Sequence, residues 1–288
     1  FTATGNEGNA LIAVKDATGE IAWSWHIWVT DQPQHHHWTN QYGTFILMDR
    51  NLGATRADRG TGDEWREGSG TLYQFGRKDP FIYDGVYNRH SQFQTPEESV
   101  KYPTSYTDCG TWWNAETLDL LWDPEKKTMW DPCPPGYMVP PKNAYDHISH
   151  YGWEWDYGRH FIYNNYSGGN AQAWFPAAPQ IDSWGYSSWR DGEGQVRTSG
   201  YYNWTHNQPT LYYNADGGWH NEPDAAEGIP VRCMRLADKF IVQTLSAAST
   251  ETSVTVKGIL VLNMEVDITE KGFVYSTSGD PKNSADGS

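Results

Sequence analysis

Hydrophobic positions follow a period of two in the N-terminal part of the chain. Every second residue from Ile21 to Val29 is apolar, which is typical of a β-strand because successive side chains of a strand point to opposite faces. An apolar run at 10–14 precedes it, and the sequence DATG at 16–19 has the composition of a turn. The pattern therefore predicts a pair of strands within residues 9–30, and a further short strand at 44–49.

Few segments have the helical period of 3.6 residues. Residues 114–122 are the best candidate, with Asn114 as the N-cap and one apolar stripe before the sequence DP. Residues 71–77 and 143–151 are two further candidates for short helices. The rest of the chain up to residue 236 has short strand patterns and long loops rich in Gly, Asn, Trp and Tyr.

The composition changes near residue 238. No Trp occurs from Lys239 onward, and three strand patterns follow, at 240–245, 253–262 and 268–275. An immunoglobulin-like sandwich needs about 100 residues, and fewer remain. We therefore expect one domain at 1–238 and a partial all-β sandwich at 239–288, in a molecule that continues further. A short β-appendage packed on the main domain is the alternative.

Charge and aromatic content narrow the class of protein. The formal net charge is −15, which argues against binding to nucleic-acid phosphates or to an anionic membrane surface. The mean hydropathy is only −0.74, yet aromatic residues make up 15% of the chain and include 16 Trp. Disordered segments are poor in aromatic residues, so we expect a folded protein with rings both in its core and on its surface.

Five phrases lie in a fixed order along the chain. They are WSWHIW at 23–28, MDRNLGA at 48–54, LYQFGRKDP at 72–80, DPCPPGYMVP at 131–140 and IPVRCMR at 229–235. Together they resemble the Fibrobacter-type major paralogous domain, a variant of the C-type-lectin-like fold found in surface lipoproteins and fimbrial-tip proteins of gut Bacteroidetes. The resemblance covers about residues 8–236 and implies an α+β domain with few short helices, short strands and long loops. The tail resembles the immunoglobulin-like modules that often follow such domains.

The chain has three cysteines, at 109, 133 and 233. The family resemblance implies a disulfide between Cys133 and Cys233, with Cys109 as a free thiol. Such a bridge would close a loop of about 100 residues, worth roughly 4 to 5 kcal/mol in the loop-entropy model, and implies an oxidising, exported setting. The alternative is that both cysteines are small buried thiols.

Aromatic rings are concentrated between residues 184 and 220, interleaved with amide and imidazole groups. Rings give a large contact area at low entropy cost and amides give adaptable hydrogen bonds, so the combination suits a sugar or a protein surface. The resembled family places its ligand face in this region, before the last strand. The alternative is a loop-rich core, and we expect about half of the rings to be buried. The predicted ligand-binding residues are Trp184, Tyr186, Trp189, Tyr201, Tyr202, Asn203, Trp204, His206, Tyr212, Tyr213, Asn214, Trp219 and His220.

Two acidic or histidine-rich stretches are candidates for metal binding. The sequence EPD at 222–224 partly matches the loop of calcium-dependent lectins, but no Trp-Asn-Asp follows it. We expect a solvated acidic loop, with calcium held by Asp216, Glu222 and Asp224 as the alternative. The triplet HHH at 35–37 also suggests a metal site, but neighbouring residues of an extended chain face opposite sides. We expect a solvated loop there, and we predict no cofactor.

Enzyme motifs are weak in this sequence. A formylglycine-generating enzyme of related fold requires a pair of reactive cysteines near its end, and only Cys233 lies there. Neither a phosphate loop nor a Gly-x-Ser-x-Gly elbow occurs. We therefore expect a cell-surface adhesin or fimbrial-tip component, anchored to the outer membrane through other parts, and not an enzyme. Its expected partner is a glycan or a host or bacterial surface protein. A structural subunit of a surface assembly, or a carbohydrate-active enzyme, is the alternative.

Overall fold

Contacts between Cα atoms divide the chain into an N-terminal unit, Phe1–Arg235, and a C-terminal unit, Leu236–Ser288. The division lies close to residue 238, where the composition changes. The computed structural model describes residues 5–83, 95–107, 121–146, 155–163, 171–188, 192–200, 207–236, 241–249 and 254–261. These residues form mostly short strands in small sheets, with few helices, as expected for the fold class. None of the helices in the described ranges is long and apolar enough to span a membrane.

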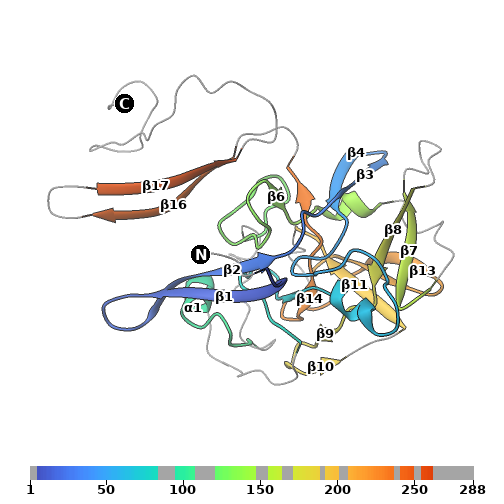
Figure 1. Ribbon diagram of the computed structural model, residues 1–288, viewed down its shortest axis with the longest axis horizontal. Coiled ribbons are helices and arrows are strands. Elements are labelled where there is room, and N and C mark those ends of the chain that lie inside the picture. The colour runs from blue at the N-terminus through green and yellow to red at the C-terminus, as the bar shows by residue number, and fades with distance from the viewer. Residues whose placement is uncertain are drawn as a thin grey trace. The chain divides into compact units, whose positions relative to one another are not determined.

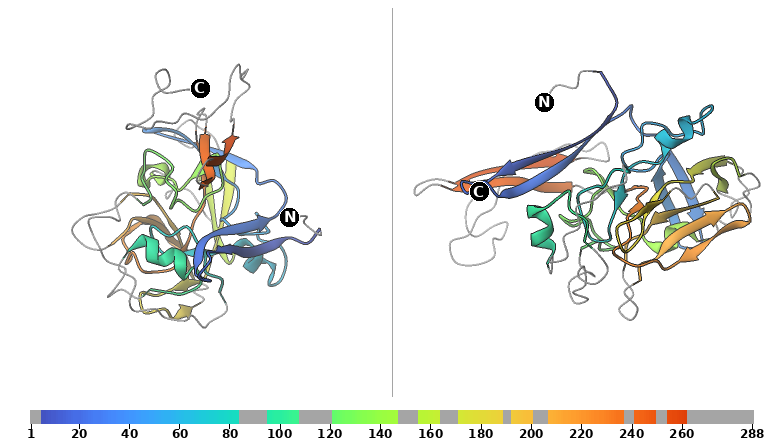
Figure 2. Two further views of the ribbon diagram at one scale, coloured as in Figure 1. Left: turned by 90° about the vertical axis from the view of Figure 1, so that its left-hand side faces the viewer. Right: turned by 90° about the horizontal axis from the view of Figure 1, so that it is seen from below.

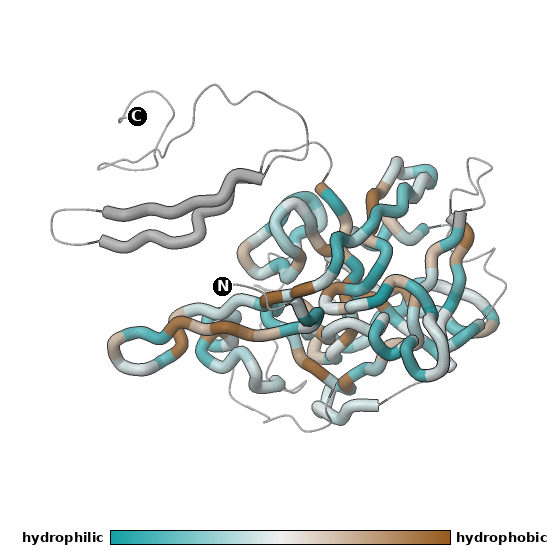
Figure 3. The backbone as a smooth tube through the Cα atoms, viewed as in Figure 1, coloured by the Kyte–Doolittle hydropathy of each residue, from teal (hydrophilic) through white to brown (hydrophobic). Residues whose placement is uncertain are grey.

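The N-terminal unit begins with the β-hairpin that the alternating pattern predicts. β1 (Gly8–Lys15) and β2 (Ile21–Val29) are antiparallel neighbours. Asp16 starts the turn, because its Oδ1 accepts hydrogen bonds from the backbone amides of Thr18 at 2.8 Å and of Glu20 at 3.0 Å. Figure 1 shows the two strands side by side, and Figure 3 shows the apolar stretch of β1 in brown. The predicted pair of strands is confirmed.

The described α-helix lies outside the three predicted helices. α1 (Pro96–Lys101) lies beside β2 and starts with a capping box. Thr95 Oγ1 accepts from the backbone amide of Glu98, and the Glu98 carboxylate accepts from the amide of Thr95, both at 3.3 Å. Proline at the first helical position fits because it has no amide proton to leave unpaired. With six residues, the helix is too short for a hydrophobic period, so its caps are its main sequence signal.

The helix predicted at 71–77 is wrong. β5 (Leu72–Tyr73) pairs with β14 (Ile229–Pro230) over this stretch. Gly76 then has a φ of +80°, a left-handed conformation that cannot continue a right-handed helix. Long-range strand pairing and one glycine therefore override the local propensity.

The other two predicted helices are only partly described. Two short 3₁₀ helices are described, η1 (Glu64–Gly68) and η2 (Lys142–Tyr145). η1 lies outside all of the predicted helices. η2 covers the start of the segment predicted at 143–151, and the rest of that segment from residue 147 lies outside the described residues. The best candidate, 114–122, also lies outside them up to residue 120.

A four-stranded sheet joins segments that are far apart in the sequence. Its strands, in order, are β3 (His35–Asn40), β4 (Gly43–Met48), β15 (Met234–Arg235) and β6 (Tyr137–Met138). β4 accounts for the strand predicted at 44–49. The HHH triplet at 35–37 is part of β3, and the solvated loop expected there is wrong. Trp38 of this strand is buried and meets the ring of Phe175 edge-on. Because one face of the strand is buried in this way, the register of its pairing with β4 is fixed.

The predicted disulfide is confirmed. Cys133 and Cys233 are bonded, with their Cα atoms 5.8 Å apart and a sequence separation of 100. The carbonyl of Cys233 also accepts a 2.9 Å hydrogen bond from the amide of Met48, so the bridge ties residue 133 to the end of β4. Cys109 lies outside the described residues.

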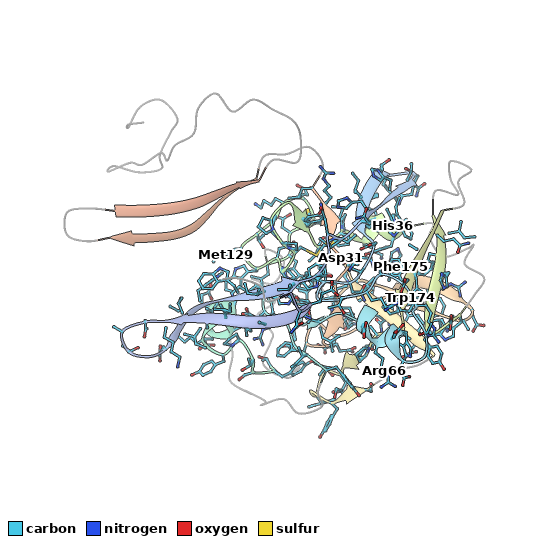
Figure 4. All side chains as sticks on the ribbon, viewed as in Figure 1. Asp31, His36, Arg66, Met129, Trp174 and Phe175 are labelled. Atoms are coloured by element: carbon cyan, nitrogen blue, oxygen red, sulfur yellow. A yellow bond between two sulfur atoms is a disulfide. The ribbon has the colours of Figure 1, made fainter. Side chains whose placement is uncertain are left out.

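The phrases that carry the family resemblance contact one another in the interior. Ser24, in WSWHIW, donates to Asp79, in LYQFGRKDP, at 2.8 Å. Arg232, in IPVRCMR, donates to Asn51, in MDRNLGA, at 3.2 Å. The Arg232 guanidinium also lies 3.6 Å from the ring centre of Phe175, which Figure 4 labels together with its neighbour in β8. These phrases therefore build the framework of the unit.

A second group of strands surrounds a cluster of rings. The strands are β7 (Gly158–Tyr163), β8 (Ala171–Pro176), β9 (Gln180–Ile181), β10 (Ser187–Ser188), β11 (Glu193–Arg197), β12 (Thr210–Asn214) and β13 (Gly217–Asn221). β7 pairs with β8, and β11, β12 and β13 form one antiparallel sheet (Figure 2). Phe161, Phe175 and Tyr213 meet edge to face between them, with ring centroids 5.2 to 5.8 Å apart. Such edge contacts are the favoured geometry of buried aromatic clusters.

The C-terminal unit contains one described hairpin. β16 (Ile241–Ser249) and β17 (Val254–Val261) are antiparallel, with a bulge between Thr244 and Ser246. These strands confirm the patterns at 240–245 and 253–262. The third predicted strand, 268–275, lies outside the described residues.

Candidate functional site

Predicted ligand-binding residues on β12 and β13 separate onto two faces of their sheet. Tyr212 is opposite Trp219 in the register of the two strands, and Leu211 is opposite His220. Because side chains alternate along a strand, Tyr212 and Trp219 share one face, whereas Tyr213 and His220 lie on the other. The strand register thus decides which of these side chains a ligand can reach.

The first face carries an open aromatic pair. The ring centroids of Tyr212 and Trp219 are 4.7 Å apart, and 47% of Trp219 is exposed. The Tyr212 hydroxyl donates to the carboxylate of Glu193 on β11, which fixes the ring. Asn214 is used within the hairpin, where its Oδ1 accepts from the amides of residues 216 and 217. Glu193 is absent from the predicted set, because only the pairing of β11 with β12 brings it to Tyr212.

Tyr213 is not a ligand-binding residue, and its prediction is corrected. Its side chain is completely buried, and its hydroxyl donates to the carbonyl of Pro176 at 2.8 Å. Its ring packs edge-on against Phe161 and Phe175, and burial raises its pKa. The alternation of β12 turns this tyrosine into the core while its neighbour Tyr212 faces outward.

His220 connects two elements. Its Nε2 lies 2.6 Å from Oδ1 of Asp146, just after η2, so the ring ties β13 to the end of that helical turn. The side chain is half-buried. A structural role on the inner side of β13 therefore fits His220 better than contact with a ligand on the Trp219 face.

Two further predicted rings lie on the turn between β9 and β10. Trp184 is 58% exposed and Tyr186 is 63% exposed. Oδ1 of Asp182 accepts from the backbone amides of both residues, each at 2.9 Å. Tyr106 donates to the Asp182 carbonyl at 2.8 Å, which anchors the turn to the body of the unit. The turn thus holds a fixed backbone that presents two rings to solvent.

Six further predicted ligand-binding residues lie outside the described ranges. They are Trp189, Tyr201, Tyr202, Asn203, Trp204 and His206. Among the described rings, the structure brings Tyr212 and Trp219 together, and it holds Trp184 and Tyr186 on a separate element. The candidate site therefore has two parts: the sheet pair, Tyr212 and Trp219, and the turn pair, Trp184 and Tyr186.

The acidic residues near the site do not gather around one point. In the ranges that the structure describes, no group of three or more His, Cys, Asp or Glu side chains is placed to hold a metal ion. Asp216 and Glu222 are exposed, and Oδ1 of Asp224 accepts from the amide of Ala226 at 2.8 Å. In the triplet on β3, His35 lies 2.7 Å from the hydroxyl of Tyr137.

Carboxylates accompany both pairs of rings. Glu193 binds the Tyr212 hydroxyl, and Asp182 lies within the turn of Trp184. Rings beside carboxylates can stack on the apolar face of a sugar or of a side chain while the oxygens accept hydrogen bonds from the edge of the ligand. The surrounding negative charge favours neutral or cationic ligands over anionic ones. The chemistry that this arrangement supports is non-covalent recognition.

Comparison of the chain with protein-family models, with curated proteins and with solved structures gave no match. The resemblance to the Fibrobacter-type major paralogous domain therefore remains a prediction from the sequence.

Proposed function

We propose that this chain belongs to an exported cell-surface binding protein, of the adhesin or fimbrial-tip type, that recognises a glycan or protein ligand through exposed aromatic rings. The N-terminal unit would be a C-type-lectin-like domain, and the C-terminal unit the start of an immunoglobulin-like sandwich. The single observation that carries the proposal is the exposure of Trp184, Tyr186 and Trp219 on backbone elements that are themselves hydrogen-bonded in place.

Exposed rings on a fixed backbone favour binding for a physical reason. Leaving a Trp side chain in water forgoes roughly 1.5 to 3 kcal/mol of hydrophobic burial, and a partner that covers the ring recovers it. Tyr212 already packs against Trp219, and the Glu193 carboxylate holds its hydroxyl. Little side-chain entropy is then lost when a ligand stacks on the pair.

The disulfide supports the exported location. Bridges of this kind persist in oxidising compartments and are rare in the cytosol. The bond between Cys133 and Cys233 is buried in the framework of the N-terminal unit, so this fold is consistent with assembly in an oxidising compartment.

Binding can be tested with the whole chain on a glycan array and in a pull-down from intact gut mucus. We expect retention of neutral glycans or of a mucus protein, with weaker signals for sialylated and sulfated glycans. A structural subunit would instead bind neither, and the same rings would be covered by a neighbouring chain in the assembled surface structure. Turnover of a bound glycan would favour the enzyme alternative.

A further inference from the structure

The outer edge of β1 has no strand neighbour in the ranges that the structure describes. β1 and β2 form a two-stranded sheet, and none of the other backbone hydrogen bonds of the described residues involves Gly8–Lys15. Figure 1 shows this hairpin along one side of the N-terminal unit. In an antiparallel pair, every second residue turns its backbone N–H and C=O away from the partner strand. The edge of β1 is therefore open to a further strand.

The side chains along this edge are apolar and uncharged. Residues 10–14 have the sequence ALIAV, and Ala10, Ala13 and Val14 are exposed, Val14 by 46%. Monomeric proteins protect such an edge with a central charge, a proline or a bulge. The irregularity between β1 and β2 lies at the end of the pair, where β2 carries an extra residue, Ala22, so β1 itself is regular up to Lys15. A regular apolar edge of this length favours pairing with another strand.

Opposite charges lie at the two ends of the edge. Glu7 directly precedes the strand, Lys15 is its last residue, and both are exposed. One oxygen of Glu7 accepts from the backbone amide of Asp31 at 3.0 Å, which holds the carboxylate at the end of the hairpin. A strand with an acid at one end and a base at the other is complementary to a second copy of itself, because a two-fold axis brings unlike ends together.

The positions of the two charges select one symmetric register. A two-fold axis at Leu11 places this residue opposite itself, and it places Glu7 of each copy opposite Lys15 of the other. Moving the axis by one residue in either direction places Lys15 opposite an uncharged residue, at position 5 or 9. Opposite charges that face each other across two strands stabilise their pairing, and like charges destabilise it. The register centred on Leu11 is therefore the one that the charges favour.

We propose that two copies of this chain associate edge to edge through β1, as an antiparallel four-stranded sheet centred on Leu11. Backbone hydrogen bonds and the apolar side chains of ALIAV supply the affinity, and the two pairs of Glu7 with Lys15 set the register. One strand from each copy makes a small contact, so we expect a dissociation constant in the micromolar range. The contact uses none of the exposed rings of the candidate site, so this proposal and ligand recognition can fail independently.

The test measures self-association of the whole chain by sedimentation equilibrium, from about 1 to 300 μM. A salt concentration of about 0.15 M screens repulsion between charges more than about 8 Å apart, which matters at a net charge of −15. The variants are Glu7→Lys and Lys15→Glu, alone and mixed in equal amounts. Glu222→Lys and Lys126→Glu are matched controls, because they make the same charge changes at exposed positions outside β1. Melting curves check that all four variants are folded.

We expect the wild type to dimerise, and each β1 variant alone to dimerise about tenfold more weakly, because like charges then face each other at both ends. The two variants change the net charge in opposite directions, so a general charge effect cannot weaken both. Their mixture should restore wild-type affinity, since every facing pair is again of opposite sign. Native mass spectrometry with one variant labelled with ¹⁵N should show the mixed dimer. The controls should behave as the wild type does.

A wild type that stays monomeric up to about 300 μM would overturn the proposal. Unchanged association in both β1 variants would also overturn it and would assign the dimer to another surface. A mixture that associates no better than its components would contradict the register centred on Leu11, and equal losses in the controls would contradict a role of β1.

Discussion

Tyr212 and Trp219 lie directly opposite each other on β12 and β13, with ring centroids 4.7 Å apart, on the face of the sheet that is open to solvent. The next residue along β12, Tyr213, is fully buried on the opposite face. Two adjacent tyrosines in one predicted ligand segment thus lie on opposite faces of the sheet, and only Tyr212 is on the face of the exposed Trp219.

Replacing Tyr213 by Ala should destabilise the fold strongly. The change removes a ring that packs against Phe161 and Phe175 and a hydroxyl bonded to the carbonyl of Pro176. We expect the free energy of unfolding to fall by about 3 to 5 kcal/mol, measured by urea denaturation. Trp219→Ala is the control and should cost less than about 1 kcal/mol. Equal losses in the two variants would mean that the two faces of the sheet are wrongly assigned.

Gly194 should not tolerate a side chain. A Cβ built at this position would lie 2.4 Å from the ring of Tyr213, which is opposite it in the strand pair. We expect Gly194→Ala to lower the free energy of unfolding by about 1 to 3 kcal/mol through overpacking. Gly192→Ala is a matched control two residues away, because nothing lies within 4 Å of its Cβ position. A stable Gly194→Ala variant would contradict the packing of Tyr213.

Breaking the disulfide should destabilise the N-terminal unit. In the loop-entropy model, a bridge with a separation of 100 residues is worth about 4 to 5 kcal/mol. We expect the double variant Cys133→Ala, Cys233→Ala to lose most of this amount in urea denaturation. Mass mapping of the unreduced wild-type protein should find the Cys133–Cys233 peptide. A bridge through Cys109 would show that the pairing is wrong.

Stability should decline as the pH falls from about 6.5 toward 4. Burial lowers the pKa of His26 from 6.5 to about 4, and the charge of Asp79 offsets this only in part. Below pH 6.5 the unfolded chain therefore binds a proton that the folded chain does not, which favours unfolding. His36, whose pKa burial also lowers to about 4, adds to the same decline.

The contribution of His26 can be separated with a His26→Gln variant. Its imidazole lies 2.8 Å from Asn9 Oδ1 and 3.0 Å from the Tyr73 hydroxyl, so an amide keeps polar contacts without titrating. Urea midpoints between pH 7 and pH 5 should fall less steeply in the variant. This range avoids the carboxylates whose pKa is lowered, such as Asp31, because they lose stability only at lower pH. An identical slope would contradict the role of His26.

The sequence predicted those elements whose structure is determined by interactions between residues close together in the chain. The hairpin of β1 and β2 follows from alternation and from the Asp16 turn, and both properties are readable within twenty residues or so. α1 was readable from Thr95 and Glu98, but its single capping box is easily overlooked beside longer periodic segments. The helix predicted at 71–77 failed because β14, far along the chain, pairs with it.

The candidate site was predicted less completely, because it depends on register and on tertiary contacts. Composition identified the aromatic segment, but only the pairing of β12 with β13 separates Tyr212 from Tyr213.

The most direct measurement of the central claim is the affinity of the strongest array or mucus ligand for Trp219→Ala, for the double variant Trp184→Ala, Tyr186→Ala, and for Trp25→Ala. Trp25 is a matched control, because it is 40% exposed but lies on the β1–β2 hairpin. We predict that at least one of the first two variants loses about 30-fold in affinity, the equivalent of the roughly 2 kcal/mol expected for a central aromatic contact, and that Trp25→Ala binds as the wild type does. Unchanged affinity in both ring variants, or an equal loss in Trp25→Ala, would contradict recognition through these rings.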